Sequence, residues 1–241
     1  MIRSRSVARS LAALAVPVLL AAGSSGGGTL PTIPPQTPAP STSAAASDSG
    51  HPGPTYPPGC PTSQPAPLGE ADSRTVTIAT PKGDIVIAIK GSLSPIATGN
   101  FVALASCGYY DGVVFHRLVP GFVIQGGDGQ FGRSPDVIPD LVGTGGPPYT
   151  IQDEPVTATY GRGTVAMART SQPNSVGSQF FIVLDDGARD ALAQYNTYQI
   201  IGTVTSGMDV VDAIAAMPNS GSPNNAAIDP VPMTKVTVST P

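Results

Sequence analysis

Short stretches in which β-branched residues alternate with small or polar ones predict strands along most of the chain after residue 72. Such alternation places every second side chain on the same face of a sheet. The first two stretches flank Pro81-Lys82-Gly83, which predicts a hairpin. The stretches that predict strands are 75–80, 84–90, 113–118, 122–125, 164–167, 179–184, 199–204 and 233–239.

Two other stretches have apolar residues at helical spacing. The first begins at Pro95 and ends at Gly108, a residue type that suits a helix C-terminus. The second covers 207–217, where Val211 and Ile214 share a face. Many short strands with only two helices indicate a mainly β domain, an antiparallel barrel or a sandwich.

The amino-terminal residues lack both patterns. A basic start with Arg3 and Arg5, an apolar run over 11–22 and small residues after it predict a secretory signal peptide over 1–23. That run is shorter than the roughly 20 residues that span a bilayer, so an uncleaved signal anchor is the weaker interpretation. We therefore expect an extracytoplasmic protein that contacts a membrane only through an uncleaved signal.

Residues 24–71 are rich in Pro, Ser, Gly and Ala and predict a disordered linker, because they offer little apolar surface to bury. A proline-rich recognition motif is the alternative. The folded domain is predicted over 72–241. Cys60 of the linker and Cys107 of the domain could pair in an oxidising compartment, but their spacing does not decide this.

Composition excludes several function classes. Charged residues make up 12% of the chain and the formal net charge is -4, which argues against nucleic-acid binding. Two histidines and two cysteines do not form a metal site of the usual spacing. No EF-hand, phosphate loop or nucleophile elbow is present. A carboxylate site for Ca²⁺ or Mg²⁺ stays open, although we expect neither metal nor cofactor.

Four blocks of sequence resemble the signature of the cyclophilins. They are Phe-His-Arg-Leu-Val-Pro-Gly-Phe-Val-Ile-Gln-Gly-Gly-Asp at 115–128, Gly-Thr-Gly-Gly at 143–146 with Asp-Glu at 153–154, Gly-Thr-Val-Ala-Met-Ala at 163–168 followed by Gly-Ser-Gln-Phe-Phe-Ile at 177–182, and Gly-Met-Asp-Val-Val at 207–211. The blocks occur in the order of the family and span roughly 75–238.

The resemblance implies a closed eight-stranded antiparallel barrel capped by two helices, with a peptide groove on its outer face. It also implies a peptidyl-prolyl cis-trans isomerase with Arg117 as the catalytic residue. The implied partners are proline-containing peptides and unfolded exported proteins, bound by a monomer. The implied substrate-binding residues are Phe122, Val123, Gln125, Thr144, Met167, Ala168, Gln179, Phe181, Leu192 and Tyr198.

Strand alternation separates some of these residues. An isolated arginine on a strand is usually a surface ion-pair partner, but alternation places Arg117 on the face opposite His116 and Leu118. Phe180 and Phe181 likewise point to opposite faces, so we expect Phe180 in the core and Phe181 in the groove. Without the resemblance, Phe122, Val123 and Met167 would all be interpreted as core residues.

The sequence departs from the family pattern in three places. It has no tryptophan near Leu192, so tight cyclosporin binding is not expected. Tyr198 stands where many relatives carry histidine. Arg169 stands where relatives often have asparagine, and the loop up to Gly177 is about one residue longer, which bears on the residue preferred before proline. A noncatalytic proline-peptide-binding module or holdase is the alternative function, although the arginine and the apolar residues favour the isomerase.

Overall fold

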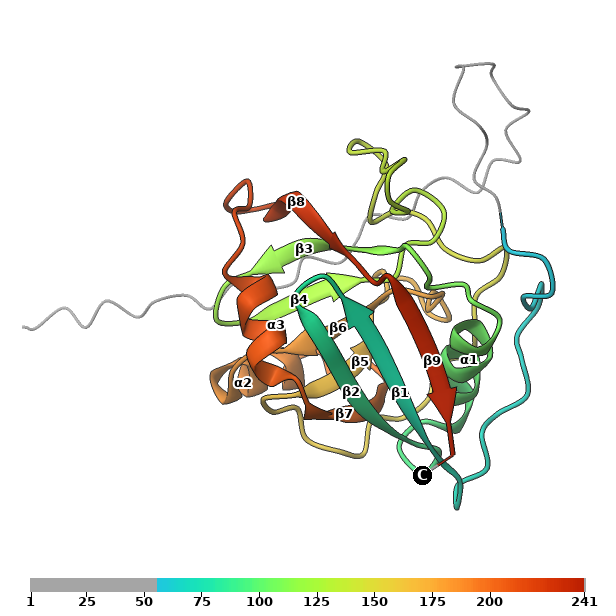
Figure 1. Ribbon diagram of the computed structural model, residues 1–241. Helices are drawn as coiled ribbons and strands as arrows, with labels where there is room; N and C mark the ends of the chain where they lie inside the picture. Colours follow the sequence, from blue (N-terminus) through green and yellow to red (C-terminus); the bar gives the residue numbers. More distant parts are fainter. Residues whose placement is uncertain (1–55, 241) are drawn as a thin grey trace, which may run out of the picture.

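Nine strands form one antiparallel sheet in the computed structural model, which describes residues 56–240. The spatial order is β8-β3-β4-β6-β5-β7-β2-β1-β9, and the sheet curls around its own interior (Figure 1). The strands are β1 (Ser73–Thr80), β2 (Gly83–Lys90), β3 (Val114–Val119), β4 (Val123–Gly126), β5 (Thr164–Met167), β6 (Phe180–Val183), β7 (Ile200–Ser206), β8 (Ala226–Pro232) and β9 (Lys235–Ser239).

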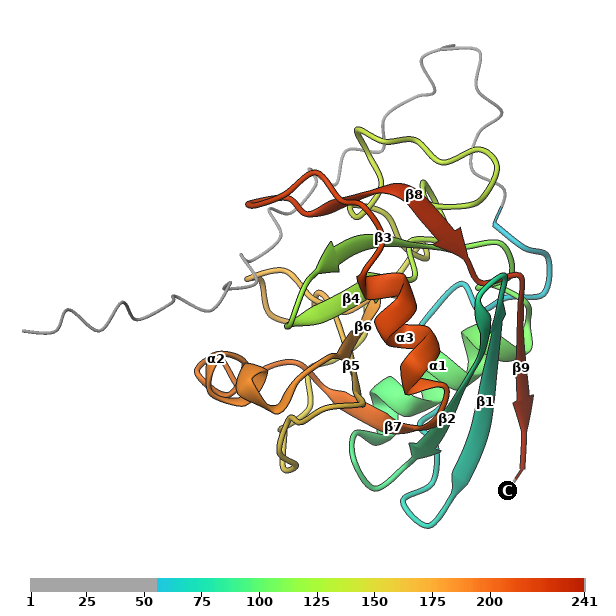
Figure 2. The same ribbon diagram turned by 60° about the vertical axis from the view of Figure 1, so that its left-hand side comes forward.

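Both predicted helices are present. Helix α1 (Pro95–Ser106) contacts β9 and β7, and α3 (Met208–Ala215) contacts β2 and β4. The two helices pack against the curled sheet at different places (Figure 2). A 3₁₀ turn, η1 (Asp186–Ala188), and a short helix, α2 (Arg189–Ala193), were not predicted, because five residues are too few to show helical periodicity.

The expected closed eight-stranded barrel is wrong in strand number and closure. The additional strand is β8. It was not predicted, because it contains Pro230 and Pro232 and prolines weaken a strand prediction. No ladder joins β8 to β9 within residues 56–240, so the sheet is an open, curled half-barrel. The two residues that connect β8 to β9 bond to the chain beside these edges: Met233 N donates to Val113 O at 2.8 Å, and Thr234 N donates to Ala79 O at 2.8 Å.

The interior of the curl is filled by apolar side chains, which we call the interior cluster. Four of its aromatic rings pack edge to face or tilted, with Phe180 contacting Phe101, Tyr110 and Phe115 at centroid distances of 5.3, 5.7 and 6.1 Å. Such pairs add packing energy beyond simple burial of area. Phe180 is therefore a core residue, as alternation predicted.

The expected linker is shorter than the sequence suggested, because residues 56–71 pack against the domain. Cys60 and Cys107 form a disulfide with a Cα–Cα distance of 5.2 Å. Leu68 is buried, and its N–H donates to Pro95 O at 2.9 Å. This segment is thus attached near both ends of α1, at Cys107 and at Pro95, which composition alone did not reveal.

The predicted signal and most of the predicted linker lie outside the described residues. Between residues 56 and 240, no helix combines the length and the hydropathy that crossing a bilayer requires.

Candidate active site

Four side chains lie in one row across the middle of the sheet. Register pairs Arg117 of β3 with Gln125 of β4, Gln125 with Phe181 of β6, and Phe181 with Ala166 of β5. Residues directly opposite each other in a ladder point to the same face of a sheet. Three predicted site residues are therefore brought together, and Ala166 joins them without having been predicted.

A β-bulge sets the direction of the row at β3. The register shifts between Phe115 and Arg117, so that one additional residue, His116, stands in β3. Both Phe115 and Leu118 belong to the interior cluster. The bulge thus allows Arg117 to face outward although Phe115, two residues earlier, faces inward.

The outward face carries a second group of buried apolar residues, which we call the outer apolar cluster. Six of the predicted substrate-binding residues belong to it, and the rings of Phe181 and Tyr198 meet edge to face at 5.4 Å. The cluster consists of Val119, Phe122, Val123, Tyr160, Ala166, Ala168, Phe181, Val183, Ala188, Leu192, Tyr198 and Ile200.

Met167 is a correction to the predicted site. Its side chain is fully buried in the interior cluster, whereas its neighbours Ala166 and Ala168 belong to the outer apolar cluster. Adjacent residues of a strand point to opposite faces, so Met167 and Ala168 cannot line the same pocket. Met167 pairs with Phe180, which shares its inward direction.

Arg117 is half-buried and has an unused donor. Its Nη1 is buried and has no hydrogen-bond partner among residues 56–240. Burial lowers the pKa of Arg117, and the neighbouring Tyr198 opposes that change. A guanidinium nevertheless stays charged in proteins. The outer face therefore presents a desolvated cation with a free N–H beside an apolar cluster.

Two glutamines connect Arg117's row to a neighbouring loop. The Nε2 of Gln125 donates to Oε1 of Gln179 at 3.0 Å. The Nε2 of Gln179 in turn donates to Gly143 O and Gly145 O, each at 2.9 Å. The predicted residue Thr144 lies between these two glycines and is exposed. The loop thus lies along the site with its backbone held by side chains of the sheet.

Asp128 also holds this loop, through its backbone N–H groups, and was not predicted as a site residue. Its carboxylate is fully buried and accepts four backbone hydrogen bonds at 2.7 to 3.0 Å. Carboxylates that accept several backbone N–H groups make strong local anchors. The four donors are Gln130, Phe131, Gly143 and Gly145. Position 145 must be glycine, because a Cβ there would lie 2.5 Å from Asp128 Oδ1.

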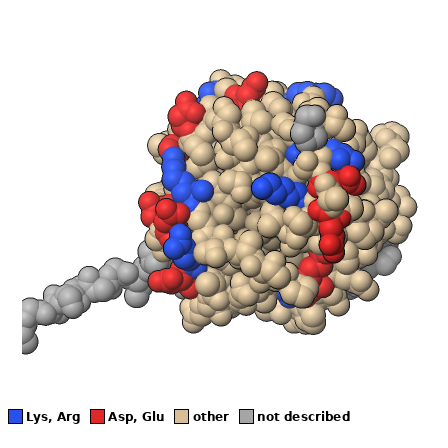
Figure 3. Space-filling model, turned by 90° about the horizontal axis from the view of Figure 1, so that it is seen from below, with Lys and Arg blue, Asp and Glu red and all other residues tan. Residues whose placement is uncertain are grey.

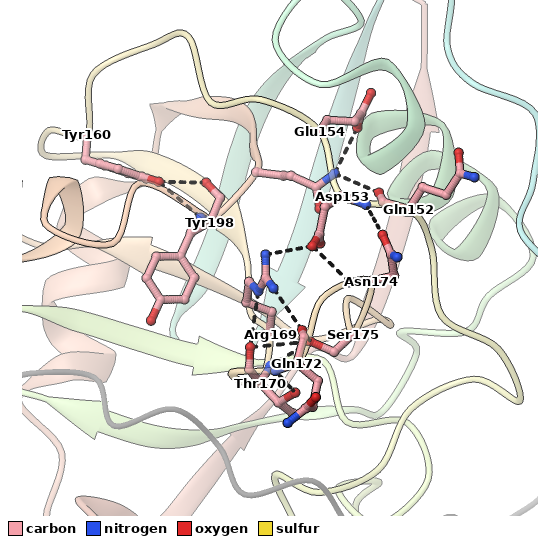
Figure 4. A network of polar contacts seen from close by, with 11 residues as sticks. Gln152, Asp153, Glu154, Tyr160, Arg169, Thr170, Gln172, Asn174, Ser175 and Tyr198 are labelled. Carbon is pink, nitrogen blue, oxygen red and sulfur yellow. Dashed lines mark hydrogen bonds and ion pairs between the residues drawn. The ribbon is translucent and has the colours of Figure 1, made fainter.

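Tyr160, also missed, fixes Tyr198 through its backbone. Its hydroxyl donates to Tyr198 O at 2.9 Å and accepts from Tyr198 N at 3.2 Å (Figure 4). Burial raises the pKa of the Tyr198 hydroxyl, with Tyr195 acting in the same direction and Arg169 and Arg117 opposing it. The hydroxyl of Tyr198 therefore remains neutral over the physiological range.

One face of the molecule carries few charged side chains. The face in Figure 3 is mostly uncharged, with acidic and basic residues mainly towards its margins. No group of three or more His, Cys, Asp or Glu side chains suited to a metal occurs between residues 56 and 240.

A separate pocket of about 240 Å³ lies near Tyr56 and Tyr109 and includes none of the predicted site residues. The row that contains Arg117 therefore lies on the outer face of the sheet and does not line this pocket.

Comparisons with known proteins agree with this arrangement. Residues 75–238 match the family described as cyclophilin type peptidyl-prolyl cis-trans isomerase. A probable peptidyl-prolyl cis-trans isomerase of Brucella abortus (strain 2308) is 39% identical over 166 residues, which cover 68% of this chain and 82% of that protein. The peptidyl-prolyl cis-trans isomerase of Acinetobacter baylyi is 36% identical over 166 residues, covering 68% and 84%.

A crystal structure of a cyclophilin type peptidyl-prolyl cis-trans isomerase from Cryptosporidium parvum superposes with a TM-score of 0.58 at 30% sequence identity. The match covers 70% of this chain and 99% of that chain. The family match extends over most of the chain and coincides with the domain that carries the row of Arg117. The chain belongs to the cyclophilin family of peptidyl-prolyl cis-trans isomerases.

Proposed function

We propose that this isomerase accelerates rotation about Xaa-Pro bonds of exported proteins, with Arg117 as its catalytic residue. The observation that carries the proposal is the buried, unpartnered Nη1 of Arg117 in one row with Gln125 and Phe181. An unused cationic donor beside an apolar cluster is costly for stability, since buried polar groups normally find a partner. A substrate atom would supply that partner.

The reaction explains why such a donor is useful. Amide resonance imposes a barrier of about 20 kcal/mol, so an uncatalysed prolyl bond isomerises over tens to hundreds of seconds. In the twisted transition state the prolyl nitrogen regains its lone pair and accepts a hydrogen bond, which it cannot do in the planar ground state. A guanidinium directed at that nitrogen binds the transition state preferentially.

The size of this effect can be bounded. A hydrogen bond to a charged group contributes roughly 1.5–3 kcal/mol. Because about 1.4 kcal/mol corresponds to tenfold in rate, Arg117 supplies on the order of ten- to a hundredfold. The remaining acceleration comes from holding the proline ring against the outer apolar cluster, where low polarity favours the twisted amide over the more polar planar one.

A relative supports the kind of ligand. One structure of the Cryptosporidium parvum cyclophilin was obtained in the presence of the dipeptide Ala-Pro. That protein is 30% identical to this chain, and the match covers 69% of this chain. We infer that Phe122, Val123, Phe181 and Leu192 receive the proline ring here, because all four belong to the outer apolar cluster beside Arg117.

Two observations support a role outside the cytoplasm. The chain begins with residues that predict a secretory signal. Cys60 and Cys107 form a disulfide, and disulfides persist mainly in oxidising compartments. Unfolded exported proteins are therefore the proposed clients.

The alternative is a noncatalytic proline-peptide-binding module or holdase on the same fold. An NMR exchange assay on a proline-containing peptide separates the two, with wild type and Arg117→Ala compared at equal concentration. We expect isomerisation by wild type and a ten- to hundredfold lower kcat/KM for the variant. Equal rates would refute the role of Arg117, and peptide binding without activity in wild type would favour the binding module.

A further inference from the structure

Arg169 follows Ala168, a member of the outer apolar cluster, yet its own side chain does not extend into solvent. The side chain is 10% exposed, and its Nη1 lies 3.0 Å from Oδ2 of Asp153. Its Nε donates to Thr170 O at 3.1 Å and its Nη2 donates to Gln172 O at 2.8 Å. One guanidinium therefore joins three acceptors from two separate segments (Figure 4).

The loop that Arg169 holds, residues 170–175, has no apolar core of its own. Its residues are Thr, Ser, Gln, Pro, Asn and Ser, and most of them are exposed. Asp153 completes the attachment: Oδ2 accepts from Asn174 N at 2.9 Å, and Asp153 N donates to Asn174 Oδ1 at 2.8 Å. Buried Val176, which forms a β-bridge with Ile151, holds the end of the loop, and these polar contacts hold residues 170–175 themselves.

The loop begins and ends beside the active site. Ala168 precedes it and Gln179 follows it, and Ala168 N donates to Gln179 O at 2.8 Å. Ala168 packs with Phe181 and Tyr198 in the outer apolar cluster, while Gln179 bonds to Gln125 in Arg117's row. A displacement of the loop would therefore move both ends of the edge that a bound peptide meets.

We propose that Arg169, paired with Asp153, is a positioning residue that fixes this loop and thereby sets the affinity for the peptide segment flanking the proline. The proposal rests on the proposed isomerisation at Arg117. Arg169 acts without contacting the substrate, because each of its three guanidinium nitrogens is already engaged, by Asp153, Thr170 and Gln172. Its loss weakens ground-state and transition-state binding equally, which raises KM and leaves kcat unchanged.

The experiment compares the kinetics of Arg169→Ala, Arg169→Lys and Asp153→Asn with wild type. We expect KM to rise about tenfold in Arg169→Ala, equivalent to ~1.4 kcal/mol of peptide binding, with kcat within twofold. Arg169→Lys should restore KM only in part, because an ammonium replaces a planar fork of donors. Combining Arg169→Ala with Asp153→Asn should raise KM by less than the product of the single effects.

A matched control exists at the surface. Arg162 pairs with Asp212 at 2.6 Å, but the two side chains are 42% and 49% exposed, and neither belongs to the outer apolar cluster. We expect Arg162→Ala to leave KM and kcat unchanged. Amide hydrogen exchange gives a second readout: Thr170 and Asn174 should exchange faster in Arg169→Ala, while Gly143 and Gly145 should not.

Two results would overturn the proposal. One is an unchanged KM with unchanged exchange at Thr170 and Asn174. The other is a loss of activity that only follows the fraction of unfolded protein, with faster exchange throughout the domain. Peptide affinity measured by NMR titration distinguishes this failure from failure of the proposed function: an inactive wild type that still binds the peptide refutes isomerisation but leaves the effect of Arg169 on binding measurable.

Discussion

Arg117 and Phe181 stand on either side of Gln125 in one cross-strand row of β3, β4 and β6. Adjacent strands lie about 4.8 Å apart, so the backbone positions of Arg117 and Phe181 are roughly 10 Å apart, with Gln125 between them. Because all three side chains project from paired strands, their spacing is set by the backbone ladder and not by loop conformation. A rigid spacing of this kind suits a reaction that needs positioning and no proton transfer.

Phe180 and Phe181 offer a matched pair of substitutions on one strand. We expect Phe181→Leu to lower kcat/KM roughly tenfold, because about 1.4 kcal/mol of apolar contact with the proline is lost. We expect Phe180→Leu to lower the free energy of unfolding by about 1–2 kcal/mol, since its ring packs against three aromatic neighbours. Urea titration and the peptide assay measure the two effects separately.

The contrast between these variants is the decisive outcome. Per folded molecule, Phe180→Leu should keep its activity. If both variants lost activity to the same extent, the division between the interior cluster and the outer apolar cluster would have no functional meaning.

Asp128→Asn should weaken the loop that contains Gly143 and Gly145. An amide retains one acceptor oxygen in place of two, so two of the four backbone donors lose their partner. Each unsatisfied buried N–H costs about 1–3 kcal/mol. Hydrogen exchange should accelerate at Gly143 and Gly145, and kcat/KM should fall because Gln179 loses fixed acceptors. Unchanged exchange at both glycines would contradict this role of Asp128.

The stability of the domain should depend on pH through His116. Burial lowers the pKa of this imidazole from 6.5 to about 4, with Asp128 opposing the change and Arg117 adding to it. Between these two values the unfolded chain binds a proton that the folded protein does not. The contribution of His116 to the free energy of unfolding is therefore fully present above pH 6.5. It is lost as the pH falls towards 4, and the loss amounts to roughly 3 kcal/mol in total.

Denaturant titrations at pH 7, 5.5 and 4.5 measure this effect. The comparison is made with His116→Gln, so that the contribution of this imidazole is separated from that of all other groups. The variant should lose less stability over this range than wild type does. Parallel curves for the two proteins would assign the pH dependence to other groups.

Removing the disulfide should affect stability more than catalysis. Cys60 and Cys107 are separated by 47 residues in the sequence, and closing a loop of this size stabilises by about 4 kcal/mol on the chain-entropy model. Neither cysteine belongs to the outer apolar cluster. We expect the double variant Cys60→Ser, Cys107→Ser to melt at lower temperature and to keep its kcat/KM on a short peptide. A large loss of activity below the melting transition would show that the cross-link acts on the site.

Alternation and turn residues predicted most of the strands and both larger helices, because those elements are long enough to show a period. The strand β8 was missed because prolines usually interrupt a strand. An edge strand tolerates prolines, however, and β8 lies at the edge of the sheet. Closure of the sheet could not be predicted, since it depends on which strands pair and not on any single segment.

At the site, the prediction placed Met167 in the proline pocket, although its side chain points to the face opposite Ala166 and Ala168. Asp128 and Glu154 stood within the quoted sequence blocks, but their roles depend on distant partners. Glu154, for example, accepts from Ile96 N at 2.8 Å and Ala97 N at 2.9 Å, and so caps the first turn of α1 from 57 and 58 residues away. Such contacts leave no local periodicity in the sequence, so only the folded arrangement reveals them.

The bond between Cys60 and Cys107 also determines where a mechanical load would enter the protein. A pull on the chain ahead of Cys60 reaches the domain at Cys107, the residue that caps the C-terminus of α1. The segment from Cys60 to β1 is bypassed, and the first strand is not peeled from its neighbours. A tension on the amino-terminal part of the chain would therefore be transmitted to the end of α1, and β1 would not be the first element to carry it.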